Sequence, residues 1–198
     1  VISNYPGSEE AKIALQDLKS VYIDLNDINA YASYVNSIGG NIRLEVGEQD
    51  SLTYIAAEKL FMRGDNDGAR RSLENYLQTF PEGAFSSNAN FYLGSIAFAK
   101  KEFDEAVQRF KSVIASGDTK FLEESVARTA EIEYLGNDYP AALESFKRLQ
   151  IVAENPENKQ AARLGIMRCA LQTGQQKDAL LAADELLKEP KLSPELEA

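Results

Sequence analysis

Four stretches of the sequence repeat one pattern at nearly equal intervals. Each stretch opens with a polar turn and then places an alanine at the same point. These alanines, which lie 37, 36 and 37 residues apart, are Ala69, Ala106, Ala142 and Ala179. A pattern that recurs with a period of about 20–50 residues is the signature of a repeat protein, in which each unit buries its apolar face against its neighbours.

Each alanine begins an apolar pattern with the period of an α-helix. A second packing residue follows four positions later, and a third comes three positions after that. These later positions are Leu73 and Tyr76, Phe110 and Val113, Phe146 and Leu149, and Ala183 and Leu186. Residues at i, i+4 and i+7 share one helical face. The pattern therefore predicts four amphipathic helices, each with one buried face.

A partner helix is expected before each of these, and it is clearest in residues 87–106. Its apolar stripe is formed by Ala89, Leu93, Ala97 and Phe98. This segment resembles the tetratricopeptide repeat (TPR) family. Each unit of that family has about 34 residues and forms a pair of antiparallel helices. The matching residues are Leu93 and Gly94 in the first helix, Ala106 and Phe110 in the second, and Pro81 as the closing proline.

The resemblance covers residues 50 to 193, with departures. Residues 127–136 lack the Leu-Gly pair, and Leu164-Gly165 lies three residues too early for Ala179, so we interpret that pair as a coincidence. The expected helix pairs are residues 50–85, 86–120, 121–156 and 157–193, followed by the start of a further helix.

The first 49 residues show a weaker version of the pattern. Residues 8–25 read as an amphipathic helix capped by Ser8, and residues 26–38 read as its partner. Residues 39–50 open with Gly-Gly and alternate apolar and polar residues, which predicts an extended connector whose Asp50 caps the next helix. The two ends of the chain resemble interior parts of the array, so we expect a piece of a longer protein.

The resemblance implies an all-α fold, a right-handed superhelical array (α-solenoid) of antiparallel helix pairs. About five repeats are expected, of which the first is degenerate. Such proteins bind other proteins or peptides on a concave surface and are generally not catalytic. The expected function is therefore a non-catalytic protein–protein interaction scaffold.

Composition excludes several other classes. The net charge of −10 argues against nucleic acid and anionic lipid as partners, because binding to phosphates requires basic residues. The absence of histidine removes the commonest general base and most zinc sites, and the single Cys169 excludes an internal disulfide and paired-cysteine motifs. We expect no enzyme activity, no cofactor, no metal and no membrane insertion by this chain.

The first helix of each pair usually lines the concave side in this family. That rule selects Tyr54, Glu58 and Phe61 in the first pair, Asn88, Phe91, Ser95 and Phe98 in the second, Glu124, Arg128, Glu131 and Tyr134 in the third, and Leu164, Arg168 and Leu171 in the fourth. Glu58 and Glu124 stand where a known TPR subgroup carries a clamp for a terminal carboxylate. We therefore expect no such clamp, and instead a partner with basic and apolar residues.

Residues 63–74, RGDNDGARRSLE, resemble two kinds of binding site. Arg63–Asp65 resembles an adhesion tripeptide, and Asp65, Asp67, Gly68 and Glu74 match part of a calcium loop. Arg63 stands where the first calcium ligand belongs, and the repeat needs Ala69 on a helix. We therefore predict a turn in which Gly64 ends one helix and Asp65 or Asp67 caps the next.

The sequence leaves the cellular location of the protein and two alternative functions open. The pattern of Phe80, Pro81, Gly83, Ala89 and Tyr92 resembles envelope proteins of Gram-negative bacteria, which favours the periplasm or the outer membrane over the cytoplasm. One alternative function is that of a glycan-binding or other small-ligand-binding envelope lipoprotein, although the chain has no tryptophan for a sugar platform. Another is the accessory repeat region of a larger multidomain protein. Oligomeric state and partner identity do not follow from the sequence.

Overall fold

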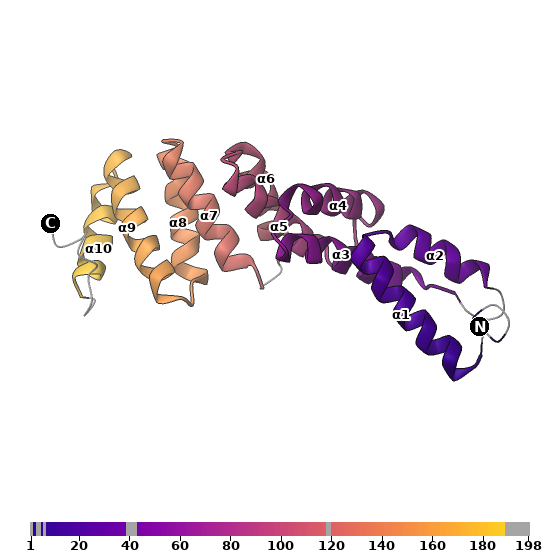
Figure 1. Ribbon diagram of the computed structural model, residues 1–198. Helices are drawn as coiled ribbons and strands as arrows, with labels where there is room; N and C mark the ends of the chain where they lie inside the picture. The colour runs from indigo at the N-terminus through magenta and orange to yellow at the C-terminus, as the bar shows by residue number, and fades with distance from the viewer. Residues whose placement is uncertain (1, 3–4, 6, 39–42, 118–119, 189–198) are drawn as a thin grey trace. The chain divides into compact units, whose positions relative to one another are not determined.

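The computed structural model describes residues 2, 5, 7–38, 43–117 and 120–188, and it folds this part of the chain into ten helices without a strand (Figure 1). The predicted all-α, solenoid-type fold class is confirmed. The helices are α1 (Glu9–Leu25), α2 (Ile28–Ser37), α3 (Val46–Met62), α4 (Asn66–Thr79), α5 (Ser86–Ala99), α6 (Phe103–Ser116), α7 (Leu122–Leu135), α8 (Tyr139–Val152), α9 (Pro156–Gln172) and α10 (Gln176–Leu187). The expected further helix near the C-terminus lies outside the described residues.

The chain divides into two compact units, residues 1–96 and residues 97–198, with the boundary inside α5. In the first unit α1 contacts α2 and α3, and α3 packs along α4. A core of Ile28, Tyr31, Val35, Leu52 and Ala56 joins α2 to α3. Leu15, Leu18 and Tyr22 of α1 pack against this core, which confirms the predicted apolar face of the first helix.

In the second unit each helix from α6 to α10 packs against the next one in sequence, and α7 also contacts α9 (Figure 1). One continuous apolar cluster runs through α7, α8, α9 and α10 and includes Phe146, Leu149, Ile166 and Cys169. The Cys169 thiol is fully buried in this cluster, and burial raises its pKa above the ordinary value, which favours the unreactive thiol form.

The helical periodicity predicted from the four alanines is confirmed. Eleven of the twelve packing positions are buried, and the exception is Ala183, which is half-buried. The packing positions are buried because one face of each of the helices α4, α6, α8 and α10 lies against neighbouring helices.

The turns inside the helix pairs share one backbone conformation. A residue with positive φ stands at the same point of each repeat, and these residues are Gly64, Lys101, Asn137 and Gly174. The N–H of the following residue donates to a carbonyl five positions earlier, as from Asp65 to Leu60 and from Asp138 to Glu133. This pattern closes the first helix of the pair and places the next residue as the N-cap of the second.

The caps explain where several helices begin. Ser8 accepts a hydrogen bond from the Ala11 N–H, as predicted. Asp65 and Asp138 likewise accept from the N–H groups of Gly68 and Ala141. Because a cap satisfies a backbone N–H group that the helix leaves unpaired, these short polar residues define helix starts from local sequence alone.

The predicted connector is wrong at its C-terminal end, while its first four residues, 39–42, lie outside the described residues. Helix α3 begins at Val46, four residues before the expected cap Asp50, and its N-cap Glu45 makes no side-chain capping bond. Asp50 is instead a buried residue inside the helix, where its carboxylate accepts hydrogen bonds from the Tyr76 hydroxyl at 2.6 Å and the Ala84 N–H at 2.9 Å. Alternating apolar residues predict an extended segment, but they carry no information about the tertiary partners of Asp50.

Candidate functional site

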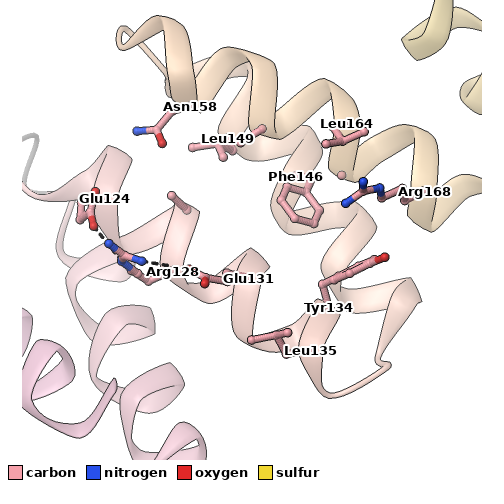
Figure 2. Close-up of a pocket in the computed structure, with 13 residues that line it drawn as sticks. Glu124, Arg128, Glu131, Tyr134, Leu135, Phe146, Leu149, Asn158, Leu164 and Arg168 are labelled. Atoms are coloured by element: carbon pink, nitrogen blue, oxygen red, sulfur yellow. Dashed lines mark hydrogen bonds and ion pairs between the residues drawn. The ribbon is translucent and has the colours of Figure 1, made fainter. Parts of the chain in front are cut away.

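The first helices α7 and α9 form the two walls of a cavity of about 300 Å³, with α8 beneath it (Figure 2). We call this cavity the α7–α9 groove. Six residues predicted for the concave surface line it, and these are Glu124, Arg128, Glu131, Tyr134, Leu164 and Arg168. The structure thus brings together residues from two successive repeats, as expected if the first helices share one face.

The floor of the groove is apolar. It is formed mainly by Phe146 and Leu149 from α8, with Leu164 and Gly165 from α9. A Cβ atom at position 165 would lie 2.4 Å from Cγ of Phe146, which is closer than two carbon atoms can approach. Gly165 therefore allows the Phe146 ring to pack directly against the backbone of α9.

This role of Gly165 was missed by the sequence analysis. The Leu164-Gly165 pair was treated as a coincidence because it lies three residues before the consensus place. Phe146 was assigned only to the helix core. The available signal was a glycine inside a strongly predicted helix, since such a residue usually has a packing reason.

An ion-pair network of three side chains lines one wall of the groove. The guanidinium of Arg128 lies 2.8 Å from Glu124 and 3.0 Å from Glu131, one turn away on either side along α7. The same guanidinium sits over the ring of Phe98, 4.8 Å from its centre. Arg128 is therefore neutralised and held in place, and the three side chains together carry one net negative charge.

The two ends of the groove present different polar groups to a ligand. Tyr134 packs its ring edge-on against Phe146 and Tyr139, and Arg168 is exposed on α9. In Figure 2 both side chains lie beside Phe146, at the end of the groove away from Asn158. One end thus presents a hydroxyl and a guanidinium, whereas the wall near Glu124 carries the net negative charge.

The predicted residues of the first unit form a different arrangement. The hydroxyl groups of Tyr54 and Tyr92 both donate to one oxygen of Glu58, at 2.6 and 2.9 Å, and the Asn88 amide donates to the Tyr54 oxygen at 3.2 Å. Burial and the hydrogen bond to Glu58 raise the pKa of Tyr54 well above its ordinary value. This network ties α3 to α5.

Tyr54 is a correction to the expected groove. It is only 2% exposed and stacks on Phe85 with ring centres 4.4 Å apart, so it belongs to the interior. Glu58 is half-buried and committed to two tyrosines, and Phe61 packs on Tyr92. Family position alone placed Tyr54 on the surface, whereas contacts with the next helix bury it.

The remaining predicted positions are spread over the surface of their helices. Phe91 and Ser95 are half-buried on α5, and the Ser95 hydroxyl donates to the Phe91 carbonyl within the helix. Leu171 is exposed on α9 but does not line the α7–α9 groove.

The segment from Arg63 to Glu74 is a turn followed by a helix. Arg63 pairs with Asp24 at 3.0 Å, Gly64 has a φ of +81°, and the Asp65 carboxylate caps α4. Both charged groups of the adhesion-like tripeptide therefore have structural partners, and of the two predicted cap residues, Asp65 and Asp67, it is Asp65 that caps the helix. Of the two arginines that follow in this segment, Arg71 is exposed and Arg70 is half-buried.

The described residues form neither a metal-binding cluster nor a membrane-spanning helix. That part of the chain brings no three side chains of histidine, cysteine, aspartate or glutamate into a group suited to a metal ion. None of its helices combines the length and the apolar character needed to cross a membrane.

Comparison with known proteins agrees with this architecture. Residues 56–119 match the sequence model of the tetratricopeptide repeat. No curated protein matches the sequence significantly.

Among solved structures, MamA from AMB-1 is 15% identical, has a TM-score of 0.59, and covers 96% of this chain and 98% of its own. A MamA double mutant, RS-1 ArsTM, is 12% identical with a TM-score of 0.57, covering 91% and 94%. A putative kinesin light chain with TPR-like repeats from Podosopora anserina is 14% identical with a TM-score of 0.50, covering 93% of each chain. The chain thus has the fold of a TPR-like helical solenoid, and residues 56–119 carry the sequence pattern of that repeat.

Proposed function

We propose that this protein is a non-catalytic interaction scaffold that binds a segment of a partner protein in the α7–α9 groove. The TPR-like fold supports the general role, since such folds serve as protein-binding scaffolds. The observation that carries the specific site is the groove itself, in which an apolar floor and charged walls come from two successive repeats.

The size and lining of the groove suit a side chain of a partner peptide. A cavity of about 300 Å³ is at the small end of ligand sites. Burying one leucine or phenylalanine side chain over Phe146 and Leu149 would contribute about 1.5–3 kcal/mol. Charged groups around the rim then fix the orientation of the bound segment and add specificity more than affinity.

The wall formed by Glu124, Arg128 and Glu131 supports the expected partner chemistry. Its net charge is negative although Arg128 stands at its centre, because two carboxylates flank that residue. A basic residue of the partner would gain from this wall, and an apolar residue would occupy the floor.

A peptide-display selection on the purified protein tests this function. The library carries random twelve-residue segments fixed at both ends, and the comparison is between the wild-type chain and Ala161→Trp. Ala161 lines the groove and is exposed, so an indole there fills the cavity without disturbing the core. We expect selected peptides to lose most of their binding to Ala161→Trp.

The control is Ala115→Trp, which places the same side chain at an exposed position on α6 outside the groove. Selected peptides should bind this variant as they bind the wild type. Enriched peptides that bind both tryptophan variants equally would place the binding surface elsewhere. A selection that enriches no peptide would contradict peptide binding by this groove.

We also propose a place in the bacterial envelope, supported by the pattern around Phe80, Pro81 and Tyr92. Fractionation of cells that express the full-length gene product at its native level checks this. Recovery with the periplasmic or outer-membrane fraction is expected, and recovery with the cytoplasm would contradict it.

A further inference from the structure

We infer that the α7–α9 groove selects its partner by the order of charges, with an acidic side chain bound at the Tyr134–Arg168 end. This inference rests on the proposed function and adds to it the order of charges along the partner segment.

Arg168 is the cation that the groove leaves for a ligand. It lines the cavity and is exposed, and no described side chain forms an ion pair or a hydrogen bond with it. Arg128, by contrast, is neutralised by two carboxylates and covered on one side by Phe98. Two arginines on facing walls therefore have opposite roles, one structural and one available.

Tyr134 places a second donor at the same end. Contacts with Phe146 and Tyr139, whose ring centres lie 6.4 and 5.7 Å away, fix its ring. The neighbouring Tyr139 hydroxyl donates to Asn137, while the Tyr134 hydroxyl makes no hydrogen bond within the described residues. A phenol and a guanidinium together can donate to one carboxylate, and such charge-assisted bonds are stronger than neutral ones.

The part of the α7 wall that precedes Tyr134 repels the same group. Glu124, at the opposite end, and Glu131, one turn before Tyr134, exceed the charge of Arg128 by one, so a carboxylate of the partner would meet net negative charge along this wall. Glu124 and Tyr134 are ten residues apart on α7, which is about 15 Å along a helix. An extended peptide covers that distance in about four to five residues. The groove thus fits a basic residue, then an apolar residue, then an acidic residue within one short segment.

We assign the carboxylate to an aspartate or glutamate side chain rather than to a chain terminus. A terminal clamp needs several free basic or amide groups, whereas Glu124 holds one such position and Arg128 is already paired. The single available guanidinium suits one side-chain carboxylate.

The test uses the same display library, in which every random segment lies inside a longer chain and has no free terminus. Peptides are selected on the wild-type chain and, separately, on Arg168→Glu. The matched control is Arg148→Glu, since Arg148 is exposed on α8, lies outside the groove and forms no ion pair among described residues. Affinities of synthetic amidated peptides are then measured by calorimetry.

We expect peptides selected on the wild type to share an apolar residue with an aspartate or glutamate on one side of it. They should bind Arg168→Glu at least about fivefold more weakly, which corresponds to the loss of an exposed charge pair. Binding to Arg148→Glu should be unchanged, and selection on Arg168→Glu should favour lysine or arginine at the acidic position.

The failures are distinguishable. Peptides that lose binding to Ala161→Trp but bind Arg168→Glu normally would overturn this inference and leave the proposed function standing. Peptides indifferent to both changes would overturn both. Binding that requires a free C-terminal carboxylate in the synthetic peptides would overturn the assignment to a side chain.

Discussion

The hydroxyl of Tyr76 donates a 2.6 Å hydrogen bond to the carboxylate of Asp50, and both groups are buried. The same hydroxyl oxygen accepts from the Phe85 N–H at 3.0 Å, and the second Asp50 oxygen accepts from the Ala84 N–H. Two helices of one repeat thereby hold the loop that leads into the next. Burial and the bond to Asp50 raise the pKa of Tyr76 well above its ordinary value, so it stays a donor.

Removing that hydroxyl should destabilise the first unit. In Tyr76→Phe the Asp50 oxygen and the Phe85 N–H each lose a buried partner, which costs about 1–3 kcal/mol. Urea denaturation followed by circular dichroism measures the change. The control is Tyr5→Phe, since Tyr5 is 69% exposed and should lose almost nothing. Equal midpoints for the two variants would contradict a stabilising role for the network.

Lys101 is the residue least suited to its backbone conformation in the four equivalent turns. Its φ is +61°, a region that glycine enters freely and other L-residues enter at a cost of about 1 kcal/mol. Lys101→Gly should therefore raise the thermal midpoint of the chain. Gly174→Ala, at the equivalent turn with a φ of +74°, should lower it. A loss of stability in Lys101→Gly would show that the lysine side chain contributes more than the strain costs.

Helix α10 lacks a side-chain cap, unlike α8. Its N-cap Gln175 makes no capping bond, whereas Asp138 caps α8 in the equivalent position. Gln175→Asp should stabilise the chain by about 0.5–1 kcal/mol, and Asp138→Ala should destabilise it by a similar amount. Chemical denaturation of both variants checks the pair. Identical midpoints for Gln175→Asp and the wild type would argue that α10 gains nothing from a cap.

Glu123 should make the stability of the second unit depend on pH. Its carboxylate accepts hydrogen bonds from the N–H groups of Glu154 and Asn155 and from the Asn158 amide, at 2.9, 3.1 and 2.7 Å. Desolvation alone would raise its pKa, but these bonds and the nearby Lys159 outweigh desolvation and lower the pKa below its ordinary value. The stabilisation is therefore present at neutral pH and is lost as the pH falls through the lowered pKa.

Glu123→Gln tests this dependence. Its stability deficit relative to the wild type should be clear near about pH 7 and should shrink below about pH 4. The comparison variant is Glu144→Gln, because Glu144 is exposed on α8 and makes only a 3.8 Å ion pair. A deficit of Glu123→Gln that is the same at both pH values would contradict the assigned role of the carboxylate.

Gly165→Ala should destabilise the second unit by about 1–3 kcal/mol, because the added methyl group overlaps the Phe146 ring. A second change, Phe146→Leu, should recover part of that loss by removing the ring. Gly47→Ala is the matched control, since a Cβ at this exposed helical position meets nothing within 4 Å. It should be neutral or slightly stabilising. No rescue by Phe146→Leu would contradict the close approach.

The helix pairs could be predicted from the sequence because their signals are local. Ala142, Phe146 and Leu149 recur on one face, and Asp138 caps the helix that carries them. A periodic face and a capping residue act within a few turns of one helix, so no knowledge of the neighbours is needed. The family resemblance then pointed to the first helices as walls of a groove, where α7 and α9 do lie.

Tertiary structure decided which of those wall residues a partner could reach. The sequence predicted Tyr54, Arg128 and Arg168 equally as residues of the concave surface. Contacts with Phe85 bury Tyr54, the ring of Phe98 lies against the Arg128 guanidinium, and Arg168 stays exposed. These contacts join side chains from different parts of the fold, about thirty residues apart in sequence. The amino-acid pattern therefore determined the helices and their shared faces, while packing between helices determined the chemistry of the groove.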